Sequence, residues 1–129
     1  MTMRPRKTGL SLGRNGLVGS LPASLGNLLQ LSTLAVEANI GLTGSALPDT
    51  LGRLTGLRSA YLYGNGLTGT IPPSIGQLVG LTKLLLNDNA LTGSIPSSLA
   101  RLTKLKELEL QHNQLTGLVP ELPFAKCEL

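Results

Sequence analysis

The sequence predicts an α/β solenoid of five stacked repeats, and three observations lead to this fold class. A short motif around an asparagine recurs every 24 to 26 residues, at Asn15, Asn39, Asn65, Asn89 and Asn113. Leucine is by far the most frequent residue, whereas aromatic residues make up only 2% of the chain. A length of 129 residues leaves room for one domain. A core of aliphatic side chains in regular layers is typical of a repeat protein.

The first element of each repeat is predicted to be a short strand with one buried face. In the fourth repeat, Leu84 and Leu86 alternate with exposed neighbours, which is the period of a half-buried strand. The asparagine that follows carries hydrogen-bond donors and an acceptor, so stacked asparagines can satisfy the backbone of neighbouring turns. We therefore expect the five asparagines to form a structural ladder.

The second element of each repeat is predicted to be a tight helical leg. Ile75, Leu78 and Leu81 recur three residues apart, a spacing that favours a 3₁₀ helix over an α-helix. Pro72 and Pro96 suit the first position of such a segment, because proline has no N–H to donate. A small residue after the first apolar one would let each leg lie close to its neighbour, at Gly26, Gly52, Gly76 and Ala100.

The second repeat departs from the pattern. Segments 39–42 and 44–48 each hold one residue more than their counterparts. We expect a local bulge between the strand and the helical leg. Such a bulge could turn side chains towards a partner, but neutral variation of a surface loop carries more weight.

The segment 65–72, Asn-Gly-Leu-Thr-Gly-Thr-Ile-Pro, closely resembles the plant-type class of leucine-rich repeats. The resemblance implies a right-handed superhelix with a concave parallel sheet and short 3₁₀ or helical segments on the convex side. It also implies a second short sheet formed by the Leu-Thr-Gly-x-Ile-Pro stretch. The class includes plant receptor-kinase ectodomains and polygalacturonase-inhibiting proteins. It therefore implies recognition of proteins, peptides or cell-wall ligands, usually outside the cell.

The expected organisation is a basic tail at 1–7, a solenoid of five repeats at 8–122 and a truncated segment at 123–129. That last segment resembles the entry to a C-terminal cysteine cap, and Cys127 is the single cysteine. We expect a fragment, or a short member held in a larger assembly. A signal peptide, an Asn-x-Ser/Thr sequon and a cysteine pair are all missing from the sequence. An intracellular or organellar location therefore agrees with the sequence as well as an extracellular one.

The residues between the buried leucines are expected to form a grid on the concave face. Tyr61 and Tyr63 lie side by side in this grid, and aromatic anchors are enriched at binding hot spots. Leu85 is expected to extend this apolar patch, although β-propensity alone would also place tyrosines on a strand. His112, on the same face, is expected to be a solvated side chain. The predicted partner-binding residues are Tyr61, Tyr63, Leu85, Lys83, Asn87, Asp88, Glu107 and Glu109.

Several function classes are disfavoured. Part of the net charge of +4 lies in the tail, at Arg4, Arg6 and Lys7, without interleaved aromatic residues, so nucleic acid is not an expected partner. The sequence has no apolar run long enough to span a bilayer. It shows no nucleophile elbow, phosphate-binding loop or metal-ligand cluster, so we predict no catalytic residue, metal or cofactor. The sequence thus predicts a non-catalytic module that binds a protein or peptide.

Two alternative functions remain open. The chain could be a structural subunit of a larger assembly, which would cover the apolar ends of the solenoid. It could also bind ice or a polysaccharide through a row of hydroxyl groups on the second short sheet. Val18 interrupts that row in the first repeat. The predicted row is Thr43/Ser45, Thr68/Thr70, Thr92/Ser94 and Thr116/Leu118.

Overall fold

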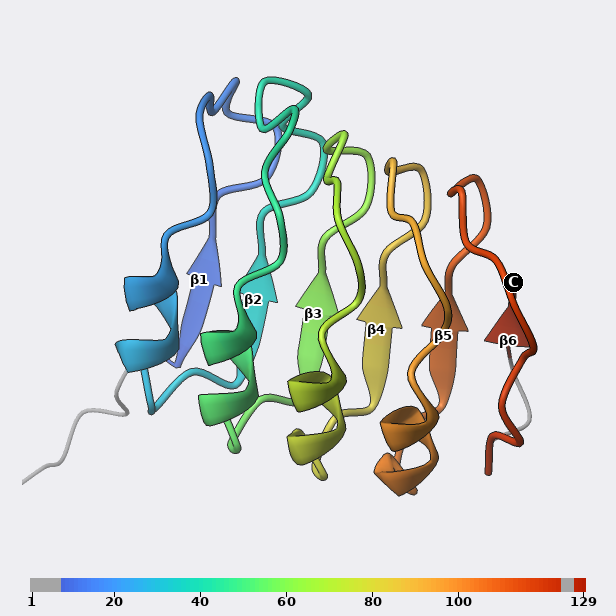
Figure 1. The fold of residues 1–129 in the computed structure, drawn as a ribbon. Coiled ribbons are helices and arrows are strands. Elements are labelled where there is room, and N and C mark those ends of the chain that lie inside the picture. The colour runs from blue at the N-terminus through green and yellow to red at the C-terminus, as the bar shows by residue number, and fades with distance from the viewer. Residues whose placement is uncertain (1–7, 124–126) are drawn as a thin grey trace, which may run out of the picture.

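Each of the first four repeats contributes one parallel strand and one 3₁₀ helix to a solenoid, and the fifth contributes a strand (Figure 1). The computed structural model describes residues 8–123 and 127–129. Six strands form one sheet in chain order. They are β1 (Gly9–Ser11), β2 (Thr33–Ala35), β3 (Ser59–Tyr61), β4 (Lys83–Leu85), β5 (Glu107–Glu109) and β6 (Cys127–Glu128). The helices are η1 (Ala23–Asn27), η2 (Asp49–Arg53), η3 (Pro73–Gln77) and η4 (Ser97–Arg101). The predicted leucine-rich-repeat solenoid is confirmed.

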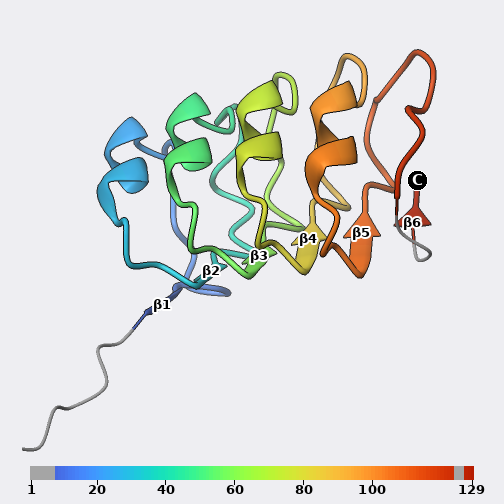
Figure 2. The same cartoon turned by 90° about the horizontal axis from the view of Figure 1, so that it is seen from below.

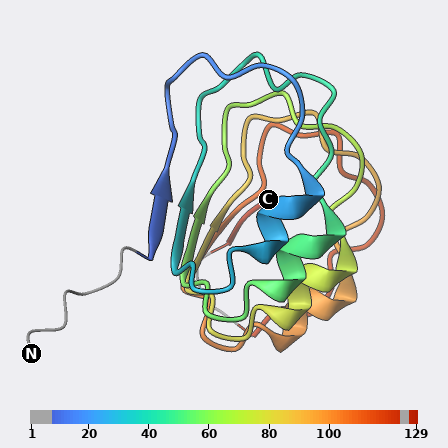
Figure 3. The same cartoon turned by 90° about the vertical axis from the view of Figure 1, so that its left-hand side faces the viewer.

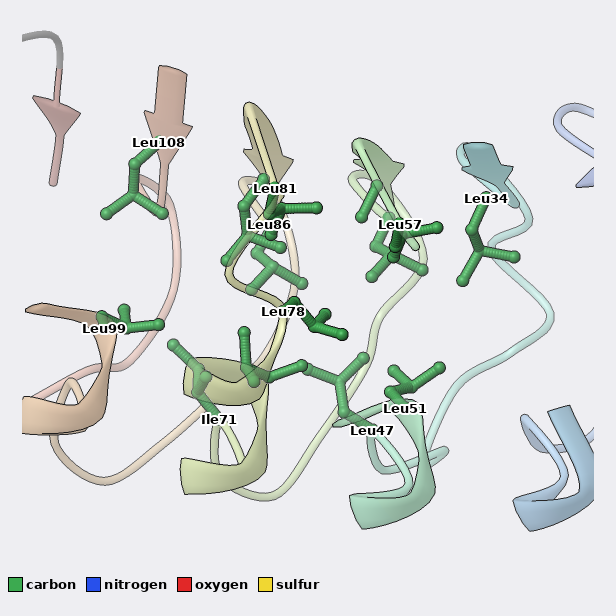
Figure 4. Packing of buried hydrophobic residues seen from close by; sticks show 14 of the residues in the cluster. Leu34, Leu47, Leu51, Leu57, Ile71, Leu78, Leu81, Leu86, Leu99 and Leu108 are labelled. Atoms are coloured by element: carbon green, nitrogen blue, oxygen red, sulfur yellow. The ribbon is translucent and has the colours of Figure 1, made fainter. Parts of the chain in front are cut away.

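The strands and the helices form two layers with the apolar core between them (Figure 3). Successive turns stack equivalent apolar side chains in register, as Leu57 does on Leu81 and Leu47 on Ile71 (Figure 4). These four side chains are almost completely buried. A single turn could not bury its own leucines, so the stack as a whole forms the core.

The strands pair with residues of equal repeat position directly opposite each other. Ser59 pairs with Lys83, Ala60 with Leu84, and Tyr61 with Leu85. In β1 to β5 the middle residue faces the core, and the two flanking residues lie on the other side of the sheet. We call the outward side of this sheet the sheet face.

The helical legs are 3₁₀ helices, as the spacing of three predicts. The prolines, however, stand one residue before the helix rather than at its first position. Pro72 has an extended backbone with φ −68° and ψ 135°, and its carbonyl accepts a hydrogen bond from the Ile75 N–H at 3.1 Å. Proline thus supplies the first acceptor of the helix at a site where its own missing N–H costs nothing.

Glycine in the legs allows close contact between neighbouring turns. A Cβ atom on Gly76 would lie 2.6 Å from the backbone oxygen of Ser98. Gly26 and Gly52 face the next leg in the same way. Ala100 occupies this position in η4, where the described part of the chain has no further helix to meet.

The extra residues of the second repeat form an additional turn. The Leu42 N–H donates to the Asn39 carbonyl at 3.0 Å, and the Ser45 N–H donates to the Leu42 carbonyl at 3.1 Å. The turn also buries Ser45, which is 1% exposed, so its predicted place in an outward row of hydroxyls is wrong. The Ser45 hydroxyl instead accepts a hydrogen bond from the Leu21 N–H at 2.7 Å.

The sheet extends into the C-terminal segment. Cys127 pairs with Leu108 and Glu128 with Glu109, so a sixth short strand follows the five predicted ones. Within residues 8–123 and 127–129, none of the helices has the length and apolar character needed to cross a membrane.

Candidate functional site

The repeated asparagines connect neighbouring turns. The Asn89 carbonyl oxygen accepts hydrogen bonds from the N–H groups of Asn65 at 3.1 Å and Leu67 at 3.0 Å. Its amide nitrogen donates to the carbonyls of Leu62 and Leu86, both at 3.0 Å. A longer bond to the Asn87 carbonyl, at 3.3 Å, completes the set. One side chain thus serves five backbone groups of two turns, which positions the residues of the sheet face.

Asn65 forms fewer of these bonds than Asn89. Its carbonyl oxygen accepts from the Asn39 N–H at 2.7 Å, and its amide donates to the Leu62 carbonyl at 2.8 Å. In the second repeat, Leu42 is the residue nearest to the repeat position of Leu67. Its N–H donates to the backbone carbonyl of Asn39 instead. The junction with the inserted residues therefore has two hydrogen bonds from its asparagine side chain, against five from Asn89 at the next junction.

The two tyrosines lie in neighbouring positions on the sheet face. Both side chains are half-buried, and within the described residues neither hydroxyl has a hydrogen-bond partner. Leu85 pairs with Tyr61 but is only 9% exposed, so its predicted role as exposed apolar surface is wrong. In parallel strands equivalent side chains stand about 4.8 Å apart. Leu85 lies between Tyr61 and Glu109 in the register, and two longer neighbours at that spacing account for its burial.

In the two turns next to Tyr63, the residue at the same repeat position has an unpaired hydrogen-bond acceptor. An Oε atom of Glu37 on one side and the Oδ1 atom of Asn87 on the other are buried and have no hydrogen-bond partner within the described residues. The Asn87 amide nitrogen donates to Asp88 at 2.6 Å, which directs its oxygen away from Asp88. Glu37 is not among the predicted partner-binding residues, although its repeat position is equivalent to that of Tyr63.

Lys83 and Glu107 begin the neighbouring strands β4 and β5, and Glu109 ends β5, so all three lie towards the C-terminal end of the sheet face. All three are half-buried. The Lys83 ammonium lies 3.5 Å from a carboxylate oxygen of Glu107, so two of the predicted residues already neutralise each other. Glu109 has no ion-pair partner within the described residues and leaves this side acidic.

Asp88 and His112 make a contact that sequence analysis did not predict. The His112 Nδ1 atom lies 2.7 Å from the Asp88 Oδ1 atom, so this histidine is exposed but is not merely solvated. Both residues have left-handed backbone, with φ 56° for Asp88 and φ 59° for His112. That conformation just before the ladder asparagine costs about 1–2 kcal/mol for a side chain with a Cβ. Asp88 and His112 hold the same repeat position in neighbouring turns, and their shared backbone conformation brings the two side chains together.

The His112 contact lowers the pKa of Asp88 below its ordinary value, and the Asn87 hydrogen bond lowers it further. Since the folded-state pKa is lowered, the associated stability is present above the unfolded-state pKa and is lost as the pH falls through the folded-state pKa. Replacing His112 with alanine is expected to raise the Asp88 pKa towards its ordinary value. Carboxyl-carbon NMR titration measures this change, and an unaltered Asp88 pKa would rule out the histidine as its main cause.

In the described residues the predicted second short sheet is reduced to isolated bridges, such as the one between Thr70 and Thr92. The exposed members of the predicted hydroxyl row are Thr43, Thr70, Thr92, Ser94 and Thr116. Leu118, 93% exposed, ends the row. Among the described residues no group of three or more His, Cys, Asp or Glu side chains is placed to hold a metal ion.

Comparison with known proteins agrees with this architecture. Residues 55–115 match the family model described as leucine rich repeat. A comparison with curated protein sequences finds no match.

Three solved structures are similar to the chain. One is a chain of the BIR3–SERK2 complex from Arabidopsis thaliana. The match covers 86% of this chain and 58% of that chain, with 37% identity and a TM-score of 0.77. Another is the ectodomain of the Arabidopsis receptor kinase GASSHO1/SCHENGEN3 in complex with CASPARIAN STRIP INTEGRITY FACTOR 2. This match covers 87% of this chain and 13% of that chain, with 39% identity and a TM-score of 0.81. The third is a plant ice-binding protein, whose match covers 78% of this chain and 32% of that chain, with 38% identity and a TM-score of 0.74. The chain thus spans less than two thirds of the length of each.

Proposed function

We propose that this chain, a leucine-rich repeat protein of the plant type, is a non-catalytic module that binds a protein or peptide partner through its sheet face. The observation that carries this proposal is the pair Tyr61 and Tyr63, adjacent on the sheet face with unpartnered hydroxyls in the described structure. Tyrosine offers a large contact area with little loss of side-chain entropy. Two of the similar structures are themselves complexes with a binding partner, which supports the same function here.

The polar surroundings of the tyrosines support a partner that donates hydrogen bonds. An unpaired buried acceptor costs about 1–3 kcal/mol, and the site holds two, on Glu37 and Asn87. Donors from a partner would satisfy both acceptors once these side chains turn towards it. Lys83, Asp88, Glu107 and Glu109 would then form the polar rim, and Leu85 would support Tyr61 from beneath.

Selection of random peptides on the immobilised protein tests this proposal. The double variant Tyr61→Ala/Tyr63→Ala is expected to bind the selected peptides with an affinity about thirtyfold lower or more, as loss of hot-spot residues does. The matched control is Val18→Ser/Leu118→Ser, which removes two exposed apolar side chains distant from the sheet face and should leave affinity unchanged. Peptides that bind the tyrosine double variant with full affinity, while circular dichroism shows it folded, would contradict the assignment.

A second candidate function is ice binding through the row of hydroxyls. The similarity to a plant ice-binding protein favours it, as does the exposed set of Thr70, Thr92, Ser94 and Thr116. The burial of Ser45 leaves Thr43 to represent the second repeat in the row. Thermal hysteresis in a solution of the protein is required by this function, and its absence would eliminate the candidate.

A further inference from the structure

Basic side chains gather on one edge of the solenoid. This return edge consists of residues 27–32, 53–58, 77–82 and 101–106, where the chain runs from each helical leg to the next strand. It is the lower edge in Figure 1, and Figure 2 views the molecule from that side. The basic residues of the return edge are all exposed: Arg53, Arg58, Arg101, Lys104 and Lys106.

The positive charge of the return edge is not balanced within it. Its four segments contain no Asp or Glu. The two ion pairs of the described residues, Lys83–Glu107 and Asp88–His112, lie on the sheet face. The Arg58 guanidinium donates to the Gly56 carbonyl at 3.1 Å, which holds its charge on the edge. The linear sequence scatters these five residues, and the repeat brings them together.

Apolar side chains share this edge with the basic ones. Leu29 is 59% exposed and Val79 is 55% exposed. They occupy the same repeat position in the first and third turns, whereas the basic residues belong to the second and fourth. Exposed apolar side chains gain nothing from a soluble polyanion, but they gain free energy in the boundary layer of a lipid bilayer.

We propose that the return edge docks on an anionic lipid surface. Arg53, Arg58, Arg101, Lys104 and Lys106 would lie at the headgroups, and Leu29 and Val79 would enter the acyl boundary. This contact is peripheral, so it needs no membrane-spanning helix. It uses none of the residues of the sheet face and is independent of the partner proposed above.

Co-sedimentation with lipid vesicles tests this inference. The protein is expected to bind vesicles of phosphatidylcholine containing about one third phosphatidylserine, and to release them as salt rises. It should not bind phosphatidylcholine alone. Each basic residue removed is expected to lower partitioning about fivefold, so Lys104→Gln/Lys106→Gln should lower it about 25-fold. Arg14→Gln, which removes an exposed charge outside the edge, is the matched control and should leave partitioning nearly unchanged.

A second variant separates a lipid surface from a soluble polyanion. Leu29→Ser/Val79→Ser keeps every charge and should weaken vesicle binding while leaving retention on a heparin column unchanged. Absence of binding to the anionic vesicles at low salt would overturn the proposal. So would vesicle binding that neither double variant reduces, or retention on heparin without vesicle binding. Circular dichroism of each variant verifies that it is folded.

Discussion

Replacing Asn89 with alanine is expected to destabilise the solenoid by about 2–6 kcal/mol. The change removes five hydrogen bonds and leaves two buried donors, the N–H groups of Asn65 and Leu67, without an acceptor. Each orphaned buried group costs about 1–3 kcal/mol. Urea denaturation followed by circular dichroism measures the change in the free energy of unfolding.

Two matched variants separate this effect from the loss of an amide in general. Asn65→Ala removes two hydrogen bonds of the ladder and should cost about half as much. Asn15→Ala removes an exposed amide that donates only to the Gly13 carbonyl and should cost about 0.5 kcal/mol or less. Equal losses for Asn15 and Asn89 would show that the ladder is not what stabilises the stack.

Gly76→Ala is expected to destabilise the protein by about 3 kcal/mol. The new Cβ would lie 2.6 Å from the Ser98 backbone oxygen and 2.7 Å from the Ser98 Cβ, so two helical legs must separate. Overpacking against backbone typically costs about 1–3 kcal/mol, because no flexible side chain can yield. Thermal unfolding measures the effect as a fall in the transition temperature.

Gly56→Ala is the control for this substitution. Its Cβ would meet only the Leu31 carbonyl, at 3.7 Å, and its φ lies outside the left-handed region. The variant is expected to be neutral, or more stable by about 0.4–1 kcal/mol, because alanine restricts the unfolded chain. If Gly76→Ala were as stable as Gly56→Ala, close contact between the legs would not be what requires glycine there.

Sequence periodicity predicts most of this fold because each repeat position has one environment. The 24-residue step places Tyr61 beside Leu85, and the spacing of three defines the 3₁₀ legs. Periodicity assigns a residue to a face, but exposure depends on the length of its lateral neighbours. For that reason the pattern predicts an exposed Leu85, whereas this residue is 9% exposed between its longer neighbours Tyr61 and Glu109. The burial of Ser45 was missed because it depends on how the inserted turn folds.

The site is less predictable from sequence than the fold. The Asp88–His112 contact depends on a left-handed backbone that a strand pattern does not reveal. The orphaned acceptors of Glu37 and Asn87 depend on side-chain orientation within a column. The return edge joins residues far apart in sequence, such as Arg58 and Lys106, which lie in the same row with only Thr82 between them.

The inserted turn of the second repeat divides the molecule into two units of unfolding. In a linear array each turn is stabilised only by its nearest neighbours, so a weakened junction lowers the free energy of opening there. The Asn65 side chain makes two hydrogen bonds where that of Asn89 makes five. The turns before that junction should therefore exchange their amide hydrogens together. Native-state hydrogen exchange should show a step in protection between the second and third turns. A gradual rise from the first turn to the fourth would instead mean simple fraying from one end.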